Sequence, residues 1–109
     1  MARHEFGMME KEPAAGERYD RYEPERYACI SVEDDLVDEI LQATVKIPVY
    51  WHTRTWPAQG LAEAGITLSP PSSMDAMLEV IAERSGFDAL EDLILRAKRC
   101  GKYVIHFGI

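Results

Sequence analysis

The residues best suited to chemistry in this chain gather in one stretch, PVYWHTRTWPAQG, at positions 48–60. It holds Tyr50, His52, Arg54 and Trp56 within a few positions of one another. An imidazole can act as a general acid or base near neutral pH. A guanidinium binds anions, and aromatic rings wall small-molecule pockets or anchor protein interfaces. The stretch therefore predicts either a functional site or one strand of a core with a polar rim.

The elements that would position these side chains follow from hydrophobic periodicity. Alternating apolar residues predict four strands, at residues 27–32, 46–53, 65–69 and 102–109. Helical spacing predicts three helices, at residues 33–45, 72–86 and 88–101. The order strand, helix, strand, strand, helix pair, strand is that of a split βαβ, ferredoxin-like fold. We therefore expect an α+β protein with a four-stranded antiparallel sheet and helices on one face.

The domain organisation is read from the same patterns. Residues 27–109 are predicted to form a single α+β domain, with the first and last strands central. Pro48 cannot donate a hydrogen bond within a sheet, so its strand is expected at an edge. Residues 1–26 lack apolar periodicity and carry the repeated triplets ERY, DRY and ERY, so we expect a poorly ordered N-terminal arm. The Arg and Tyr of these triplets are also common interface anchors.

Alternation sorts the strand residues into two faces. One set is expected to face the helices: Ile30, Val32, Val49, Trp51, Ile66, Leu68, Ile105 and Phe107. The other set is expected on an uncovered face: Tyr27, Cys29, Ser31, Tyr50, His52, Arg54, Thr67, Ser69, Val104 and His106. That face would bring together residues far apart in sequence, and it is the predicted functional surface.

Three interpretations of this surface remain open. It could be a homodimer interface, since an uncovered aromatic sheet is a liability for a monomer. It could be a small-molecule pocket, with ligand-binding residues Tyr27, Tyr50, His52, Arg54, Trp56 and His106. It could also be a catalytic site, with His52 or His106 as a general base, or Cys29 activated by His106.

Motifs for metals and cofactors are missing from the sequence. It contains no CxxC, HxH or HExxH, no glycine-rich phosphate loop and no GxSxG elbow. A metal site of Cys29, His52 and His106 would have to be assembled entirely by folding. We therefore expect no metal and no cofactor.

Composition restricts the partners. The formal net charge is −7, which disfavours nucleic-acid binding. No apolar run is long enough for a membrane span, and two cysteines suggest free thiols in a reducing cytoplasm. The cluster Glu33, Asp34, Asp35, Asp38 and Glu39 is either a solvated helix face or a docking surface for a basic partner.

Together these observations predict a small cytoplasmic binding protein. We expect it to self-associate and to engage a basic protein partner or a small polar ligand, through the open sheet face or the acidic helix. The alternative is a small enzyme with a His-centred site on the uncovered sheet face.

Overall fold

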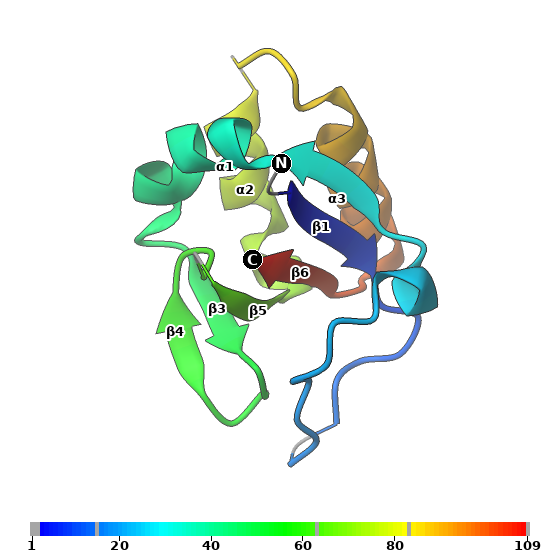
Figure 1. Ribbon diagram of the computed structural model, residues 1–109. Coiled ribbons are helices and arrows are strands. Elements are labelled where there is room, and N and C mark those ends of the chain that lie inside the picture. The colour runs from blue at the N-terminus through cyan, green and yellow to red at the C-terminus, as the bar shows by residue number, and fades with distance from the viewer. Residues whose placement is uncertain (1–2, 15, 63, 83, 109) are drawn as a thin grey trace.

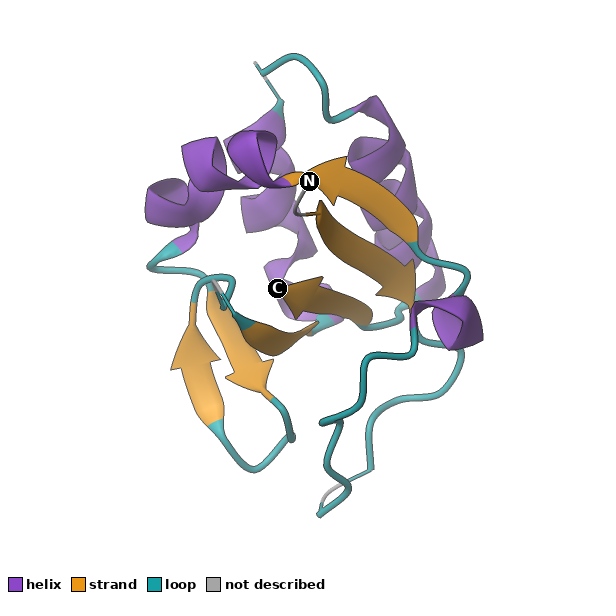
Figure 2. Cartoon of the chain, viewed as in Figure 1, coloured by secondary structure: helices purple, strands orange, loops and turns teal. Residues whose placement is uncertain are grey.

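The computed structural model describes residues 3–14, 16–62, 64–82 and 84–108. These residues form a six-stranded antiparallel sheet with three α-helices, shown in Figures 1 and 2. The strands are β1 (Arg3–Met8), β2 (Ile30–Glu33), β3 (Pro48–Trp51), β4 (Pro57–Gln59), β5 (Gly65–Ser69) and β6 (Val104–Gly108). The α-helices are α1 (Asp34–Leu41), α2 (Met74–Ile81) and α3 (Asp88–Cys100). Short 3-10 helices are η1 (Pro24–Tyr27), η2 (Gln42–Thr44) and η3 (Pro71–Ser73).

The strand order across the sheet is β2-β1-β6-β5-β3-β4, and every neighbouring pair is antiparallel. The α+β class is confirmed, but the four-stranded ferredoxin-like sheet is wrong. β6 is central, as predicted. β2, the first strand of that prediction, lies instead at an edge and pairs only with β1. β3, which contains Pro48, is an inner strand because β4 continues the sheet beyond it.

The two strands that the sequence analysis missed have weak local signals. β1 lies in the segment expected to be a poorly ordered arm, and Glu5 and Gly7 interrupt its apolar residues. β4 has three residues and begins with Pro57, which suits an edge strand. Pairing with β6 and β3, respectively, is what makes these segments strands.

The three helices cover one face of the sheet, as Figure 1 shows. Their apolar residues recur at helical spacing and meet inward-facing strand residues in one buried cluster. Its fully buried members include Val37 of α1, Met74 of α2 and Ala97 of α3. α3 ends at Gly101, whose φ of 65° closes the helix in the left-handed conformation that glycine tolerates.

The opposite sheet face is covered by chain that precedes β2. We call residues 9–14 and 16–29 the strap; it descends from β1 and returns through η1 to β2 (Figure 1). Tyr19, Tyr27 and Cys29 of the strap pack against a second buried cluster that includes Ile105 and Phe107. The sheet is therefore buried on both faces over β5 and β6.

Close approach of the strap depends on Gly7 in β1. A Cβ atom at this position would lie 2.7 Å from both Cys29 Sγ and Tyr27 Cβ, and 2.9 Å from the Tyr27 carbonyl oxygen. Glycine is therefore required where the end of the strap crosses β1. No helix in the described ranges is long and apolar enough to cross a membrane.

Candidate functional site

The residues predicted on one uncovered face are divided between two covered faces. Tyr27, Cys29 and Tyr50 pack against the cluster beneath the strap, so their predicted side of the sheet is correct. That side is buried rather than open. The expectation of an uncovered functional face is therefore wrong, because the segment predicted to be a poorly ordered arm contributes the strap.

The predicted faces of β5 and β6 are inverted. Ile66, Leu68, Ile105 and Phe107 lie beneath the strap instead of facing the helices. His106 lies on the helix side, paired in register with Phe6 and stacked on its ring at 4.6 Å. Alternation assigned these strands incorrectly because both of their faces are buried, so an apolar residue does not mark the helix side.

His52 and Arg54 hold the strap against the β3–β4 hairpin. His52 follows β3 with a φ of 62°, which takes it out of strand alternation. Its Nδ1 lies 2.9 Å from Asp20 Oδ1, and its carbonyl accepts the Tyr19 N–H at 2.7 Å. Arg54 Nη1 donates to the Pro13 carbonyl at 3.0 Å. These two predicted site residues therefore bind the strap to the β3–β4 hairpin.

Trp56 and Tyr50 complete the set of predicted ligand-binding residues. The Trp56 indole is 48% exposed, and its centre lies 6.3 Å from that of the His52 ring. Tyr50 lies 6.5 Å from Tyr103, and Tyr27 lies 6.0 Å from Phe107, both measured between ring centres. Trp56 is the member of the predicted set with an exposed aromatic surface.

Cys29 is not arranged for nucleophilic catalysis. Burial raises the pKa of its thiol to about 12, and the carboxylates of Glu5 and Glu25 add to the effect. β1 lies between the strand that follows Cys29 and β6, so the predicted pairing of Cys29 with His106 is wrong. Cys29 and His106 lie on opposite sheet faces, and with His52 at the strap the three do not form a metal site.

A chain of buried polar side chains crosses the helix side of the sheet instead. His4 Nε2 lies 2.9 Å from Asp34 Oδ1, and His4 Nδ1 lies 2.7 Å from His106 Nε2. His106 Nδ1 lies 3.3 Å from Thr67 Oγ1, which also accepts the Ala62 N–H at 2.9 Å. We call Asp34, His4, His106 and Thr67 the histidine relay. His4, His106 and Thr67 are fully buried.

The direction of each hydrogen bond in the relay is determined by the groups at its ends. The Asp34 carboxylate only accepts, so His4 Nε2 donates to it. A neutral imidazole carries one N–H, so His4 Nδ1 accepts from His106 Nε2. His106 Nδ1 in turn accepts from the Thr67 hydroxyl. When both imidazoles are neutral, each is therefore the Nε2–H tautomer. Every buried polar atom of the relay has a partner.

Burial strongly favours the neutral form of His106. Loss of solvent lowers its pKa from 6.5 to about 3, and the neighbouring His4 contributes to the shift. His106 is therefore shielded from solvent, and both of its ring nitrogens are engaged, by His4 and by Thr67. His4 lies in the segment that the sequence predicts to be a poorly ordered arm, so it is not among the predicted site residues. The signal available was the alternation of His4, Phe6 and Met8.

The exposed end of the relay belongs to a strongly acidic region. We call Glu33, Asp34, Asp35, Asp38 and Glu39 the acidic surface. Carboxylate oxygens of its three aspartates all lie within 4.8 Å of one another. Four of the five residues are exposed, and the Asp34 side chain is 40% exposed. Among the described residues, His4 supplies the one ion-pairing contact to this surface, at Asp34.

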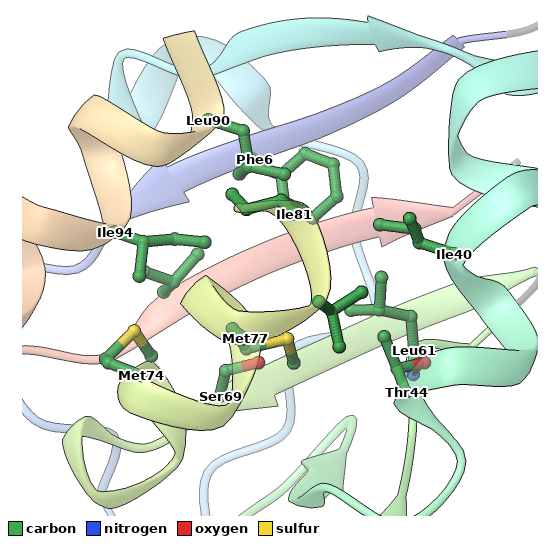
Figure 3. Close-up of a pocket in the computed structure, with 12 residues that line it drawn as sticks. Phe6, Ile40, Thr44, Leu61, Ser69, Met74, Met77, Ile81, Leu90 and Ile94 are labelled. Atoms are coloured by element: carbon green, nitrogen blue, oxygen red, sulfur yellow. Dashed lines mark hydrogen bonds between the residues drawn. The ribbon is translucent and has the colours of Figure 1, made fainter. Parts of the chain in front are cut away.

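The cavities on the two sides of the sheet differ in size. A cavity of about 20 Å³ lies between the helices and the sheet, lined by apolar side chains such as Phe6, Met74 and Ile94 (Figure 3). It is far smaller than the several hundred Å³ of a typical ligand pocket. Hollows of about 300 and 480 Å³ run along the strap and share Glu17, Tyr19, Arg26 and Tyr27. Their walls mix both signs of charge.

Comparison of the chain with protein-family models, curated proteins and solved structures finds no match. The structure itself therefore provides the description of this chain by its fold. It is an α+β protein whose antiparallel sheet is covered by helices on one face and by the strap on the other.

Proposed function

We propose that this protein acts by binding a basic protein partner through the acidic surface. The observation that carries the proposal is the convergence of Asp34, Asp35 and Asp38 within 4.8 Å at the start of α1. Carboxylates this close repel one another, and a cationic partner would relieve that repulsion. The formal net charge of −7 would also attract such a partner from a distance.

The other regions predicted to be functional are occupied by contacts within the chain, which favours the acidic surface as the binding site. The sheet face expected to mediate self-association or ligand binding is occupied by the strap. The residues proposed for catalysis are engaged elsewhere: His52 with Asp20, and His106 with His4 and Thr67. The acidic surface, in contrast, is exposed, and among the described residues its carboxylates make one ion pair, with His4.

The experiment compares two variants of equal net charge. One is Asp35→Asn/Asp38→Asn in the acidic surface. The other is Glu79→Gln/Glu91→Gln on α2 and α3, where both side chains are exposed. Each pair removes two negative charges and includes one acid from the first turn of a helix. Stability measured by urea denaturation shows that each variant is folded.

Binding is measured by the fluorescence anisotropy of labelled decalysine. Removing two charges from the acidic surface should weaken binding about three- to tenfold, if each contact contributes within the usual range for exposed pairs. The control pair should change it less than about twofold. Binding should also weaken as salt shortens the Debye length. Equal losses in the two variants would show that net charge alone attracts the probe, and would refute the proposal.

A further inference from the structure

Asp34 belongs both to the acidic surface and to the histidine relay. Its Oδ1 accepts from the buried His4, while 40% of its side chain remains exposed. We infer that the acidic surface is regulated by protons: uptake of one proton by His4 weakens the binding of a basic partner. This inference rests on the proposed function, and it adds the property that controls it.

His4 is the member of the relay placed to accept the proton. His4 and His106 are both fully buried, but His4 contacts the half-exposed Asp34 carboxylate, whereas the partners of His106 are His4 and the Thr67 hydroxyl. The carboxylates of Asp34, Asp35 and Asp38 favour a cation at His4. Two cationic residues lie nearby. Arg3 precedes His4 in β1 and is paired in register with Glu33, and Arg84 donates from Nη1 to the Glu39 carbonyl at 3.5 Å.

The elements packed against the histidines contribute no further charge. α2 and α3 present apolar residues to this face, such as Met77, Leu93 and Ile94, and their described charged residues are exposed. β5 contributes the Thr67 hydroxyl, and β1 contributes the Phe6 ring.

Proton uptake at His4 must also change the tautomer of His106. A doubly protonated His4 carries a hydrogen on Nδ1, which faces His106 Nε2 at 2.7 Å. That contact holds one hydrogen, so His106 Nε2 must give up its own and Nδ1 must take one. His106 remains neutral throughout, which agrees with its lowered pKa. The Thr67 hydroxyl then accepts from His106 instead of donating to it.

The consequence at the surface is electrostatic. A protonated His4 neutralises Asp34 from within, so a basic partner meets one fewer uncompensated carboxylate. Linkage requires the reverse effect of equal size: a bound cationic partner disfavours the proton on His4. A basic partner that binds the acidic surface should therefore displace the proton from a protonated His4.

The first test uses the wild-type protein and needs no partner. Imidazole ¹⁵N chemical shifts report the tautomer of each histidine. Near pH 7.5, His4 and His106 should both be Nε2–H tautomers. A second set of spectra is recorded at about pH 5.5, and there a proton on His4 Nδ1 should appear together with the Nδ1–H form of His106. An unchanged His106 tautomer alongside a titrating His4 would overturn the inference, as would a His4 that stays neutral.

The second test measures decalysine affinity at the same two pH values. Wild-type binding should weaken about two- to fivefold on acidification, the range for one exposed charge contact. His4→Gln keeps a donor for Asp34 but does not titrate, so its affinity should change little. His52→Gln is the matched control, because His52 also pairs with an aspartate, Asp20, away from the acidic surface. It should retain the wild-type pH dependence.

The outcomes separate the two proposals. No decalysine binding at either pH overturns the proposed function. Binding that does not depend on pH, or that depends on it equally in wild type and His4→Gln, overturns the regulation and leaves the proposed function standing. If His4→Gln does not fold, the tautomer measurement on the wild-type protein decides the question.

Discussion

His4 Nδ1 and His106 Nε2 lie 2.7 Å apart, with an angle of 6° between their ring planes, although 102 positions separate the two residues. β1 and β6 bring them together at the centre of the sheet. Because both rings are buried, the free energy of unfolding of the protein should depend on pH.

We predict that stability falls on acidification. In the unfolded chain His106 gains a proton near its ordinary pKa of 6.5, whereas in the folded protein its pKa is about 3. The contribution of His106 to the free energy of unfolding is therefore complete above pH 6.5, and it is lost as the pH falls towards 3. The slope should approach about 1.4 kcal/mol per pH unit. Urea denaturation between pH 7 and pH 4.5 measures it. His4→Phe/His106→Phe should have a shallower slope; an equal slope would contradict the assignment.

A second prediction concerns the coupling between the two histidines. His106→Phe leaves His4 Nδ1 buried without a donor, and this should cost about 1–3 kcal/mol beyond the change in packing. Adding His4→Phe removes the orphaned atom. The double variant should therefore be more stable than the sum of the single variants predicts. A double-mutant cycle in urea measures the coupling, and additive effects would argue against the hydrogen bond.

The strap should loosen when its contact with the hairpin is removed. Arg54→Met removes the donor to the Pro13 carbonyl and the cation near Glu12. We expect a loss of about 1 kcal/mol and faster tryptic cleavage within the strap, after Arg18, Arg21 or Arg26. Arg96→Met is the control, since the described ion pair of Arg96 is with Asp92, on the exposed side of α3 and away from the strap. Equal cleavage rates in the two variants would show that Arg54 does not hold the strap.

The two cysteines should differ in reactivity. With a pKa of about 12, Cys29 is ionised in about one molecule in ten thousand at pH 8. Cys100 is exposed at the end of α3. Iodoacetamide should therefore modify Cys100 first, as mass spectrometry of peptides would show. Gly7→Ala should crowd Cys29 outward and speed its alkylation; rapid labelling of Cys29 in the wild-type protein would contradict its burial.

The sequence predicts much of the secondary structure because two of its signals are local. These are the spacing of apolar residues along a helix and the Gly and Pro residues at which elements end. α1, α2 and α3 lie within their expected ranges, and so do β3, β5 and β6. β1 was missed because Glu5 and Gly7 suit a strand only when β2 and β6 lie beside it. The sheet order that depends on β1 was missed with it.

The candidate site was harder to predict because it depends on which faces are covered. His52 and Arg54 were chosen for their chemistry, but in the structure they bind the strap. His106 was placed on the wrong face because alternation cannot orient a strand buried on both sides. The acidic surface was recognised, since exposed charge at a helix start is a local property. The contact of this surface with His4 could not be predicted, because His4 and Asp34 are 30 positions apart and meet only in the folded protein.

The central position of β6 also determines when this chain can fold as it is synthesised. β1 is made first, yet one of its two partners is β6, about a hundred residues later. Until residues 104–108 leave the ribosome, β1 and β5 each lack a neighbour, and the apolar residues beneath the strap remain uncovered. Contacts this distant in sequence slow folding. The nascent protein should therefore need protection from aggregation until β6 emerges. A chain truncated at Gly101 lacks β6, so it should remain prone to aggregation.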